Sequence, residues 1–478
     1  MEKGILTQHS PAGLTGTLAS LAQALRTGAL PLLAYLEALQ ARVEAREPQL
    51  LALVPEEGRF DRLRRQAQAL LDRYPEPGAR PPLFGVPLGV KDVFHAQGFE
   101  TRAGSQLPPE RLRGPEAESV ARLKGAGALI LGKTVTTEFA YFASGPTRNP
   151  HHPEHTPGGS SSGSAAAVAA GMAPVALGTQ TIGSITRPAA FCGVVGTKPS
   201  FGRLSTLGVI PLAPSLDHIG FFTAEASAAG LIASLLIPDW RPEPAGPPWP
   251  GTPSASLRRP AAANAPSKDV GASPTRPKPV LGVPEGPYLA HTAAEGLEAF
   301  EEACDRLSKA GYRLQRLPAM ADFEQIVERH QRILAAEAAR VHAAWFVEFG
   351  DRYHPKTADL IRRGQGISAE ALAQDLRGRA ALRQELLALM EENGLDLWIS
   401  PAAPGAAPHG LDSTGDPIMN LPWTHSGLPT IGLPCGFNRA GLPFGLQLTG
   451  RWRADEALLA WAVDLERALQ EAPAMERT

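Results

Sequence analysis

Residues 157–205 read PGGSSSGSAAAVAAGMAPVALGTQTIGSITRPAAFCGVVGTKPSFGRLS. Glycine, alanine and small hydroxyl residues dominate this stretch. Its first part, residues 158–164, has no bulky side chain, so its backbone N–H groups can approach a bound ligand closely. A core built only for stability rarely requires such an approach. We therefore interpret the stretch as part of a reaction site.

The second part of the stretch predicts a short apolar strand over residues 173–177 and then a turn that ends at Ser184. Such a turn can aim consecutive backbone N–H groups at one point, which is the geometry that an oxyanion hole requires. Ser184 is then a candidate nucleophile, provided that a base accepts its proton. No histidine is present in residues 157–205, so the base has to come from another part of the chain.

A lysine at the end of a second apolar run can supply that base. Residues 85–92 read GVPLGVKD, a strand-like segment that ends at Lys91. A lysine in poor solvent has a lowered pKa, because burial disfavours the charged ammonium. It can then act as a base near neutral pH. Asp92 is expected to orient the loop without a catalytic role.

Three other patterns are weaker alternatives. Gly159–Gly163 fits the Gly-x-Ser-x-Gly elbow with Ser161 as nucleophile, but residues 152–157 read HPEHTP and offer no preceding strand. Residues 127–134 read GALILGKT and fit a phosphate-binding loop, yet their apolar centre predicts a strand. The loop histidines at 151, 152 and 155 lie among prolines and do not form a zinc pattern, so no metal site is expected.

Several motifs together resemble the amidase signature family of Ser-Ser-Lys hydrolases. They are GVPLGVKD at 85–92, GGSSSGSAAAVAAG at 158–171 and GSITRPAAFCGVVGTKPSFGRLS at 183–205, followed by LPWTHSGLPTIGLPCGF at 421–437 and GLPFGLQLTG at 441–450. The resemblance covers nearly the whole chain. It implies an α/β fold in which a large, mixed, twisted β-sheet is covered by helices on both faces.

The resemblance also implies roles for individual residues. Lys91 matches the family's base, Ser160 its bridging serine and Ser184 its nucleophile, and the two serines have the family's spacing of 24 residues. The family holds the bridging serine through a cis peptide bond, which here is Gly159–Ser160. The family's oxyanion hole is implied to use the backbone N–H groups of Thr181, Ile182 and Gly183. No metal and no organic cofactor is expected.

This chain departs from the family's usual D-T-G-G-S-I-R-x-P pattern. It has Gln180 in place of the acid and Ile182 in place of the first glycine, and its arginine, Arg187, falls one position later. Ile182 keeps its N–H group but adds bulk beside the nucleophile. Two roles remain open for Arg187: it binds a substrate carboxylate, as in branches similar to malonamidase, or it is a structural ion-pair partner.

Composition limits the class of partner and the compartment. The 478 residues carry a formal charge of −2, which gives no bulk attraction to nucleic acid or an anionic membrane. Three cysteines are too few for a disulfide framework, and no apolar run is long enough to span a membrane, so we expect a cytoplasmic protein. We expect one domain over 1–478, with a proline-rich, disordered insertion at 238–279 and a variable helical region at about 322–392. A homodimer remains open.

Three functions fit these observations. The first is a stand-alone amidase that cleaves a small carboxamide through a seryl acyl-enzyme and releases ammonia or an amine. The second is the amidase subunit of a tRNA-dependent amidotransferase, although no basic track for a tRNA is evident. The third, a non-enzymatic binding protein, is disfavoured because Lys91, Ser160 and Ser184 are all present.

Overall fold

A mixed β-sheet forms the centre of the computed structural model, which describes residues 16–241 and 277–471. Its strands lie in the order β2-β1-β3-β5-β4-β9-β10-β8-β6-β7. Their bounds are β1 Pro87–Lys91, β2 Leu129–Thr134, β3 Val175–Gln180, β4 Val195–Lys198, β5 His218–Thr223, β6 Val280–Glu285, β7 Arg313–Pro318, β8 Leu397–Pro401, β9 Thr430–Phe437 and β10 Pro443–Thr449. The strand pairs at both ends of this order are parallel, and those from β3 through β8 are antiparallel.

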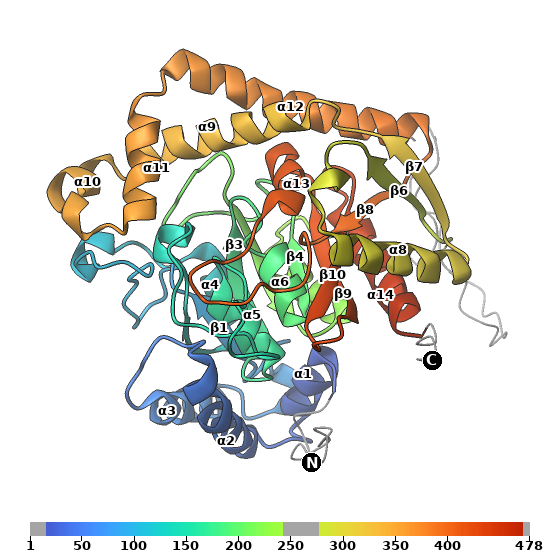
Figure 1. Ribbon diagram of the computed structural model, residues 1–478. Coiled ribbons are helices and arrows are strands. Elements are labelled where there is room, and N and C mark those ends of the chain that lie inside the picture. Colours follow the sequence, from blue (N-terminus) through green and yellow to red (C-terminus); the bar gives the residue numbers. More distant parts are fainter. Residues whose placement is uncertain (1–15, 242–276, 472–478) are drawn as a thin grey trace, which may run out of the picture.

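Helices cover both faces of the sheet (Figure 1). Their bounds are α1 Leu18–Thr27, α2 Leu32–Leu50, α3 Arg59–Arg73, α4 Glu118–Gly125, α5 Ser162–Ala169, α6 Thr186–Cys192, α7 Ala226–Leu236, α8 Ala294–Lys309, α9 Phe323–Val341, α10 Ala343–Phe349, α11 Pro355–Gln365, α12 Ala369–Glu392, α13 Leu421–Ser426 and α14 Asp455–Glu471. Helices α5 and α6 pack on one face, and α7 and α14 pack on the other. The predicted fold class is therefore confirmed.

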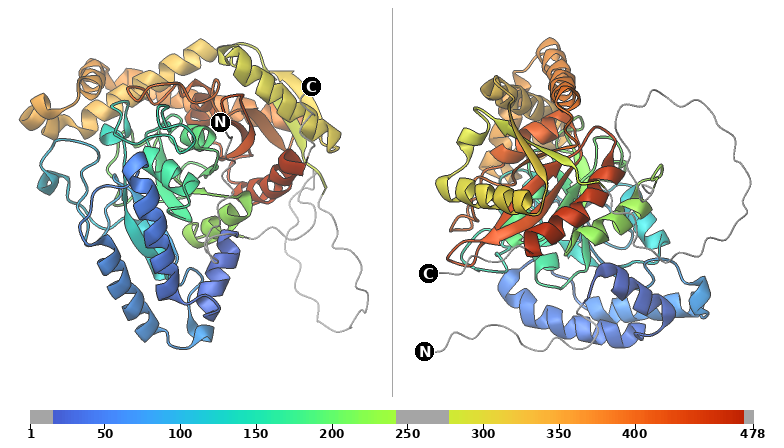
Figure 2. Two further views of the ribbon diagram at one scale, coloured as in Figure 1. Left: turned by 60° about the horizontal axis from the view of Figure 1, so that its bottom comes forward. Right: turned by 90° about the vertical axis from the view of Figure 1, so that its right-hand side faces the viewer.

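The N-terminal helices begin and end where local sequence signals place them. Thr17 caps α1 because its side chain accepts a hydrogen bond from the Ser20 N–H, and Gly28 ends the helix in the left-handed region with φ of 80°. Pro31 precedes α2, whose buried side chains recur at helical spacing. As Figure 2 shows, α1, α2 and α3 lie at one end of the molecule, opposite α9 to α12.

Strand β3 carries the chain to the turn at Ser184. The sequence predicts this strand over residues 173–177, but it begins at Val175 and extends to Gln180. The extension forms because residues 178–180 pair in register with residues 218–220 of β5. All six residues of β3 are buried, and the strand lies inside the sheet, between β1 and β5.

Helix α5 lies very close to the backbone beneath it. A Cβ atom added at Gly163 would lie 2.1 Å from the Ala52 carbonyl oxygen and 2.4 Å from the Val135 nitrogen. Only glycine allows this approach. The helix starts at Ser162 and packs against both β1 and β3. The approach therefore places the glycine- and serine-rich segment directly over the strands that carry Lys91 and Thr179.

The predicted variable helical region corresponds to α9 through α12, at residues 323–392. Most of the proline-rich insertion predicted at 238–279 lies outside the described residues. No helix in residues 16–241 or 277–471 has the length and apolar character that crossing a membrane requires.

Candidate active site

Lys91 is the last residue of β1 and is fully buried. Its Nζ donates hydrogen bonds to Ser160 Oγ and to Thr179 Oγ1, each at 2.7 Å. Burial lowers the pKa of Lys91 well below its ordinary value, and the negative charge of Asp217 opposes this shift. The dominant effect of burial favours a neutral amine, which is the form that can accept a proton.

Ser160 follows a cis peptide bond at Gly159–Ser160, as the family resemblance implies. Both peptide carbonyls around this bond have partners. The Gly159 carbonyl accepts a hydrogen bond from Arg187 at 2.7 Å, and the Ser160 carbonyl accepts one from the Thr137 N–H at 3.2 Å. The backbone of Ser160 is thereby held in front of Lys91.

Ser184 lies in the turn between β3 and α6, and its side chain is largely buried. Ser184 and Ser160 line the same narrow cavity, of about 10 Å³, together with Thr181, Ile182 and Arg187. This is room for about one water molecule. Among the described residues, no hydrogen bond links Ser184 directly to Ser160 or Lys91.

The turn before Ser184 presents free backbone donors. Within the described parts of the chain, the N–H groups of Thr181, Ile182 and Gly183 have no protein acceptor. The turn is nevertheless fixed from behind, because Gln180 Oε1 accepts hydrogen bonds from the N–H groups of Ile185 and Thr186, at 2.8 and 3.0 Å. Preorganised donors of this kind are suited to stabilising a developing negative charge.

Asp217 supports the same turn. Its carboxylate accepts a 2.6 Å hydrogen bond from the Thr181 hydroxyl and two more from the N–H groups of Leu212 and Ala213. Burial raises the pKa of Asp217 to about 6, although these three donors act in the opposite direction. Asp217 therefore joins the loop before β5 to the first residue of the turn.

Arg187 is buried beside the two serines. It donates to the carbonyls of Gly159 and Gly415 and, at 3.1 Å, to the Thr414 hydroxyl. Its Nε has no acceptor among the described residues. Burial lowers the pKa of Arg187 to about 9, and the charge of Asp416 opposes this shift. The direct partners of its guanidinium are therefore carbonyl and hydroxyl oxygens.

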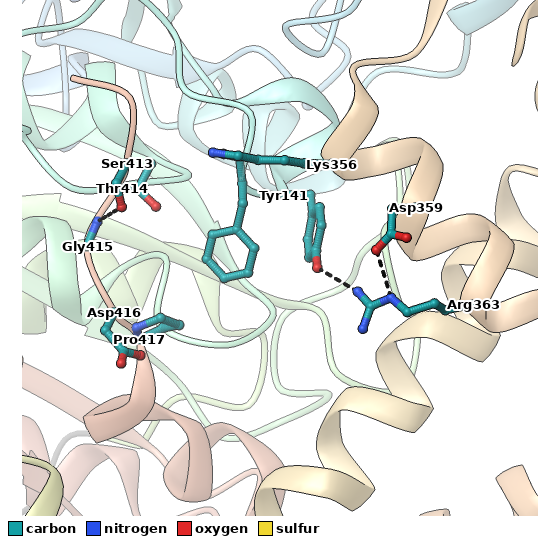
Figure 3. A pocket seen from close by; sticks show the side chains of 10 residues that line it. Tyr141, Lys356, Asp359, Arg363, Ser413, Thr414, Gly415, Asp416 and Pro417 are labelled. Atoms are coloured by element: carbon teal, nitrogen blue, oxygen red, sulfur yellow. Dashed lines mark hydrogen bonds and ion pairs between the residues drawn. The ribbon is translucent and has the colours of Figure 1, made fainter. Parts of the chain in front are cut away.

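A larger cavity of about 470 Å³ lies outside the narrow one (Figure 3). Both cavities are lined by Tyr141, Phe142 and Pro417. Helix α11 forms another wall, where Arg363 pairs with Asp359 at 3.0 Å and lies 3.4 Å from the Tyr141 hydroxyl. Lys356, also on α11, donates to the carbonyls of Phe142 and Asp412. These contacts place the outer cavity between α11 and the segment 412–417.

Two residues of α13, Trp423 and His425, line neither cavity. Trp423 lies in the core, where its indole donates to the Tyr288 hydroxyl at 3.0 Å. His425 is also buried, and burial lowers its pKa well below the ordinary value. Both side chains belong to α13, and both are buried in the core.

The loop histidines also have structural partners. His151, His152 and His155 each form a hydrogen bond with a backbone carbonyl, at 2.6 to 3.0 Å. Within residues 16–241 and 277–471, no group of His, Cys, Asp and Glu side chains has an arrangement that could hold a metal ion.

Sequence reasoning missed Thr179 and Thr424 near the site. Thr179 is the second acceptor of Lys91, and Thr424 contacts both Gln180 and the Ile182 carbonyl. Thr179 lies on β3 beside β1, so the pairing of these strands could have indicated it. Thr424 is more than 240 residues from its partners, and no local signal connects them.

The chain is similar to known proteins in sequence and in fold. Residues 34–459 match the family model described as Amidase. One subunit of the glutamyl-tRNA(Gln) amidotransferase of Synechococcus sp. (strain WH7803) is 32% identical over 469 residues, covering 90% of this chain and 92% of that protein. The corresponding subunit from Anaeromyxobacter sp. (strain K) is 35% identical over 480 residues, covering 92% and 93%. A crystal structure of an amidase superposes with a TM-score of 0.80 at 31% identity, covering 95% of this chain and 99% of that one.

Proposed function

The chain belongs to the amidase signature family of hydrolases that act on C–N bonds, and from this premise we propose that it cleaves a small carboxamide through an acyl-enzyme on Ser184. The observation that carries the proposal is the buried Lys91, which contacts Ser160 at 2.7 Å in front of the cavity that Ser184 also lines. A neutral lysine and two serines form a set that can move a proton without histidine.

In the proposed first step, neutral Lys91 accepts the proton of Ser160 while Ser160 accepts that of Ser184. Ser184 Oγ then attacks the carbonyl carbon of the amide. The N–H groups of Thr181, Ile182 and Gly183 stabilise the oxyanion, which their lack of a protein acceptor supports. A direct contact between the two serines is expected to form when substrate fills the cavity, because catalytic hydrogen bonds often tighten only in the complex.

In the second half of the reaction, Ser160 donates a proton to the leaving nitrogen as the C–N bond breaks. Ammonia or an amine departs, and the acyl group stays on Ser184. Water then attacks the ester with the same relay acting as base, and the carboxylic acid is released. The chain's own residues supply every proton transfer in this scheme.

The two cavities suggest how the substrate binds. A cavity of about 10 Å³ is too small for a carboxamide, so Tyr141, Phe142 or Pro417 has to move aside when the reacting group enters. The remainder of the substrate would occupy the outer cavity of about 470 Å³. Its charged walls favour a substrate with a polar outer part.

The direct test is release of ammonia by the purified chain from a panel of aliphatic, aromatic and carboxylate-bearing amides. The proposal predicts turnover without a partner protein and its loss in Ser184→Ala. Arg187→Ala extends the test. If Arg187 binds a substrate carboxylate, only the carboxylate-bearing amides lose activity. If it acts by holding the Gly159 carbonyl, all amides lose activity alike.

A second candidate function is the amidase subunit of a tRNA-dependent amidotransferase. The named relatives at 32% and 35% identity favour it. Gln180 and Ile182, which replace residues of the usual family pattern, weigh against it. This function predicts little ammonia release by the chain alone and strong stimulation by the other subunits together with glutamyl-tRNA(Gln). Full turnover by the isolated chain would show that the other subunits and the tRNA are not required.

A further inference from the structure

Two buried side chains join the oxyanion turn to α13. Gln180 Nε2 donates to Thr424 Oγ1 at 2.9 Å, and Thr424 Oγ1 donates to the Ile182 carbonyl at 2.5 Å. Both side chains are almost completely excluded from solvent. The contacts therefore form a short chain that runs from the end of β3 through a helix and back to the turn.

The neighbours of Gln180 determine which end of its amide faces Thr424. Its Oε1 accepts hydrogen bonds from the N–H groups of Ile185 and Thr186, at 2.8 and 3.0 Å, and only an oxygen can accept from such donors. The NH₂ group must therefore point at Thr424. The two backbone N–H donors alone are sufficient to fix this orientation of the amide.

The amide in turn determines the direction of the Thr424 hydroxyl. A hydroxyl group has a single proton, and here its oxygen accepts from the amide of Gln180. The proton is then free to be donated to the Ile182 carbonyl at 2.5 Å. The Asn420 carbonyl, at 3.2 Å, is the weaker competitor.

Holding the Ile182 carbonyl also aims the next N–H group. The carbonyl of Ile182 and the N–H of Gly183 belong to one planar trans peptide and point in opposite directions. Thr424, on α13, binds the carbonyl side of this peptide. The Gly183 N–H is therefore directed away from α13. That N–H has no protein acceptor among the described residues.

We propose that Gln180 and Thr424 are positioning residues that aim the Gly183 N–H at the reacting carbonyl oxygen. The inference rests on the proposed function of Ser184. An acid at position 180, as in the usual family pattern, could accept the same two backbone hydrogen bonds but could not donate to Thr424. The Thr424 proton would then turn toward the carboxylate and leave the Ile182 carbonyl. Glutamine thus changes how this turn is held.

The test compares Thr424→Val and Gln180→Glu with the matched control Thr424→Ser, which keeps the hydroxyl. For an amide that the native enzyme hydrolyses, the first two variants should lower kcat by about 10- to 100-fold, short of the roughly 10²- to 10³-fold effect of deleting an oxyanion donor. KM should stay within about 3-fold, because the aimed N–H acts mainly on the transition state. Thr424→Ser should retain nearly native kcat.

Three results would overturn the inference: native kcat in both Thr424→Val and Gln180→Glu, a loss in Thr424→Ser equal to that in Thr424→Val, or losses that follow a lowered Tm. If Thr424→Val does not fold, Gln180→Glu decides the question alone, and native kcat there contradicts the inference. Failure of the proposed function is distinct, because the native chain itself would then neither release ammonia nor react with a fluorophosphonate.

Discussion

At the residue scale, the proposed mechanism depends on the charge state of one lysine, Lys91. Lys91 has hydroxyl partners at 2.7 Å and no carboxylate in direct contact within the described residues, so burial can dominate its pKa. Asp217 supplies the opposing charge from the other side of the turn. The balance between these two groups should set the pH range in which the enzyme works.

Asp217→Asn tests that balance. Above pH of about 6 Asp217 is a carboxylate and raises the pKa of Lys91. A base loses activity as the pH falls through its pKa, so removing the negative charge should move the acid limb of kcat/KM to lower pH. The measurement is the pH profile of both proteins, with Tm as the control for folding. An acid limb that stays in place or moves to higher pH would contradict the assignment.

The sequence motifs predicted individual residues best at positions where the proposed reaction tolerates few residue types. They predicted Lys91, Ser160 and Ser184, and the structure brings the first two into contact and the last two into one cavity. Their catalytic roles stay predictions until they are tested. Thr424 could not be predicted, because its contact with Gln180 depends on how α13 packs against a distant strand.

At the scale of elements, the position of α5 depends on close packing at Gly163. Gly163→Ala places a methyl group against the Ala52 carbonyl and the Val135 nitrogen, so we expect a loss of about 1–3 kcal/mol and a lower Tm. Gly230 in α7 is the matched control, since a Cβ there has no neighbour within 4 Å. Gly230→Ala should be neutral or stabilising by up to about 1 kcal/mol, because alanine favours helix.

Thermal unfolding of the two alanine variants at one pH checks this prediction. Equal Tm values for Gly163→Ala and the native chain would show that α5 can shift away from Ala52 and Val135 without cost. A large loss in Gly230→Ala would show that the difference does not come from packing.

Element boundaries were predicted well where a local signal existed. Gly28 and Pro31 lie between α1 and α2, as residues that disfavour helix do, and the leucine and isoleucine residues of GALILGKT, predicted as a strand, lie in β2. Strand β3 extends beyond its apolar run because β5 provides backbone partners for Gly178 to Gln180. No local sequence signal predicts that pairing, since β5 begins 38 residues after the end of β3.

At the scale of the whole molecule, the outer cavity depends on segments that are far apart in the sequence. Its walls come from residues 141–142, from α11 and from residues 413–417, so no local pattern could predict it. The large mixed sheet with helices on both faces was predicted, because the motifs span nearly the whole chain. Organisation as one domain over 1–478 stays a prediction.

Lys356 tests whether the substrate occupies this cavity. Its ammonium joins α11 to the carbonyls of Phe142 and Asp412. Lys356→Met should raise KM by roughly 3- to 10-fold, the equivalent of about one hydrogen bond, and leave kcat nearly unchanged, because the residue lies outside the reacting centre. Steady-state kinetics on the panel of amides provides the measurement.

Lys309→Met is the control for Lys356→Met, since Lys309 is exposed on α8, away from α11 (Figure 1). It should change neither constant. Two results would contradict binding of the substrate in the outer cavity. One is a fall in kcat at constant KM for Lys356→Met, and the other is the same effect in Lys356→Met and Lys309→Met.

The most direct measurement of the central claim is mass spectrometry of the chain after reaction with a fluorophosphonate. We predict a single covalent adduct on Ser184, absent from Ser184→Ala and formed far more slowly in Lys91→Met and Ser160→Ala. An adduct on Ser161 or another residue, or labelling of Lys91→Met at the native rate, would contradict a serine nucleophile activated through a buried lysine.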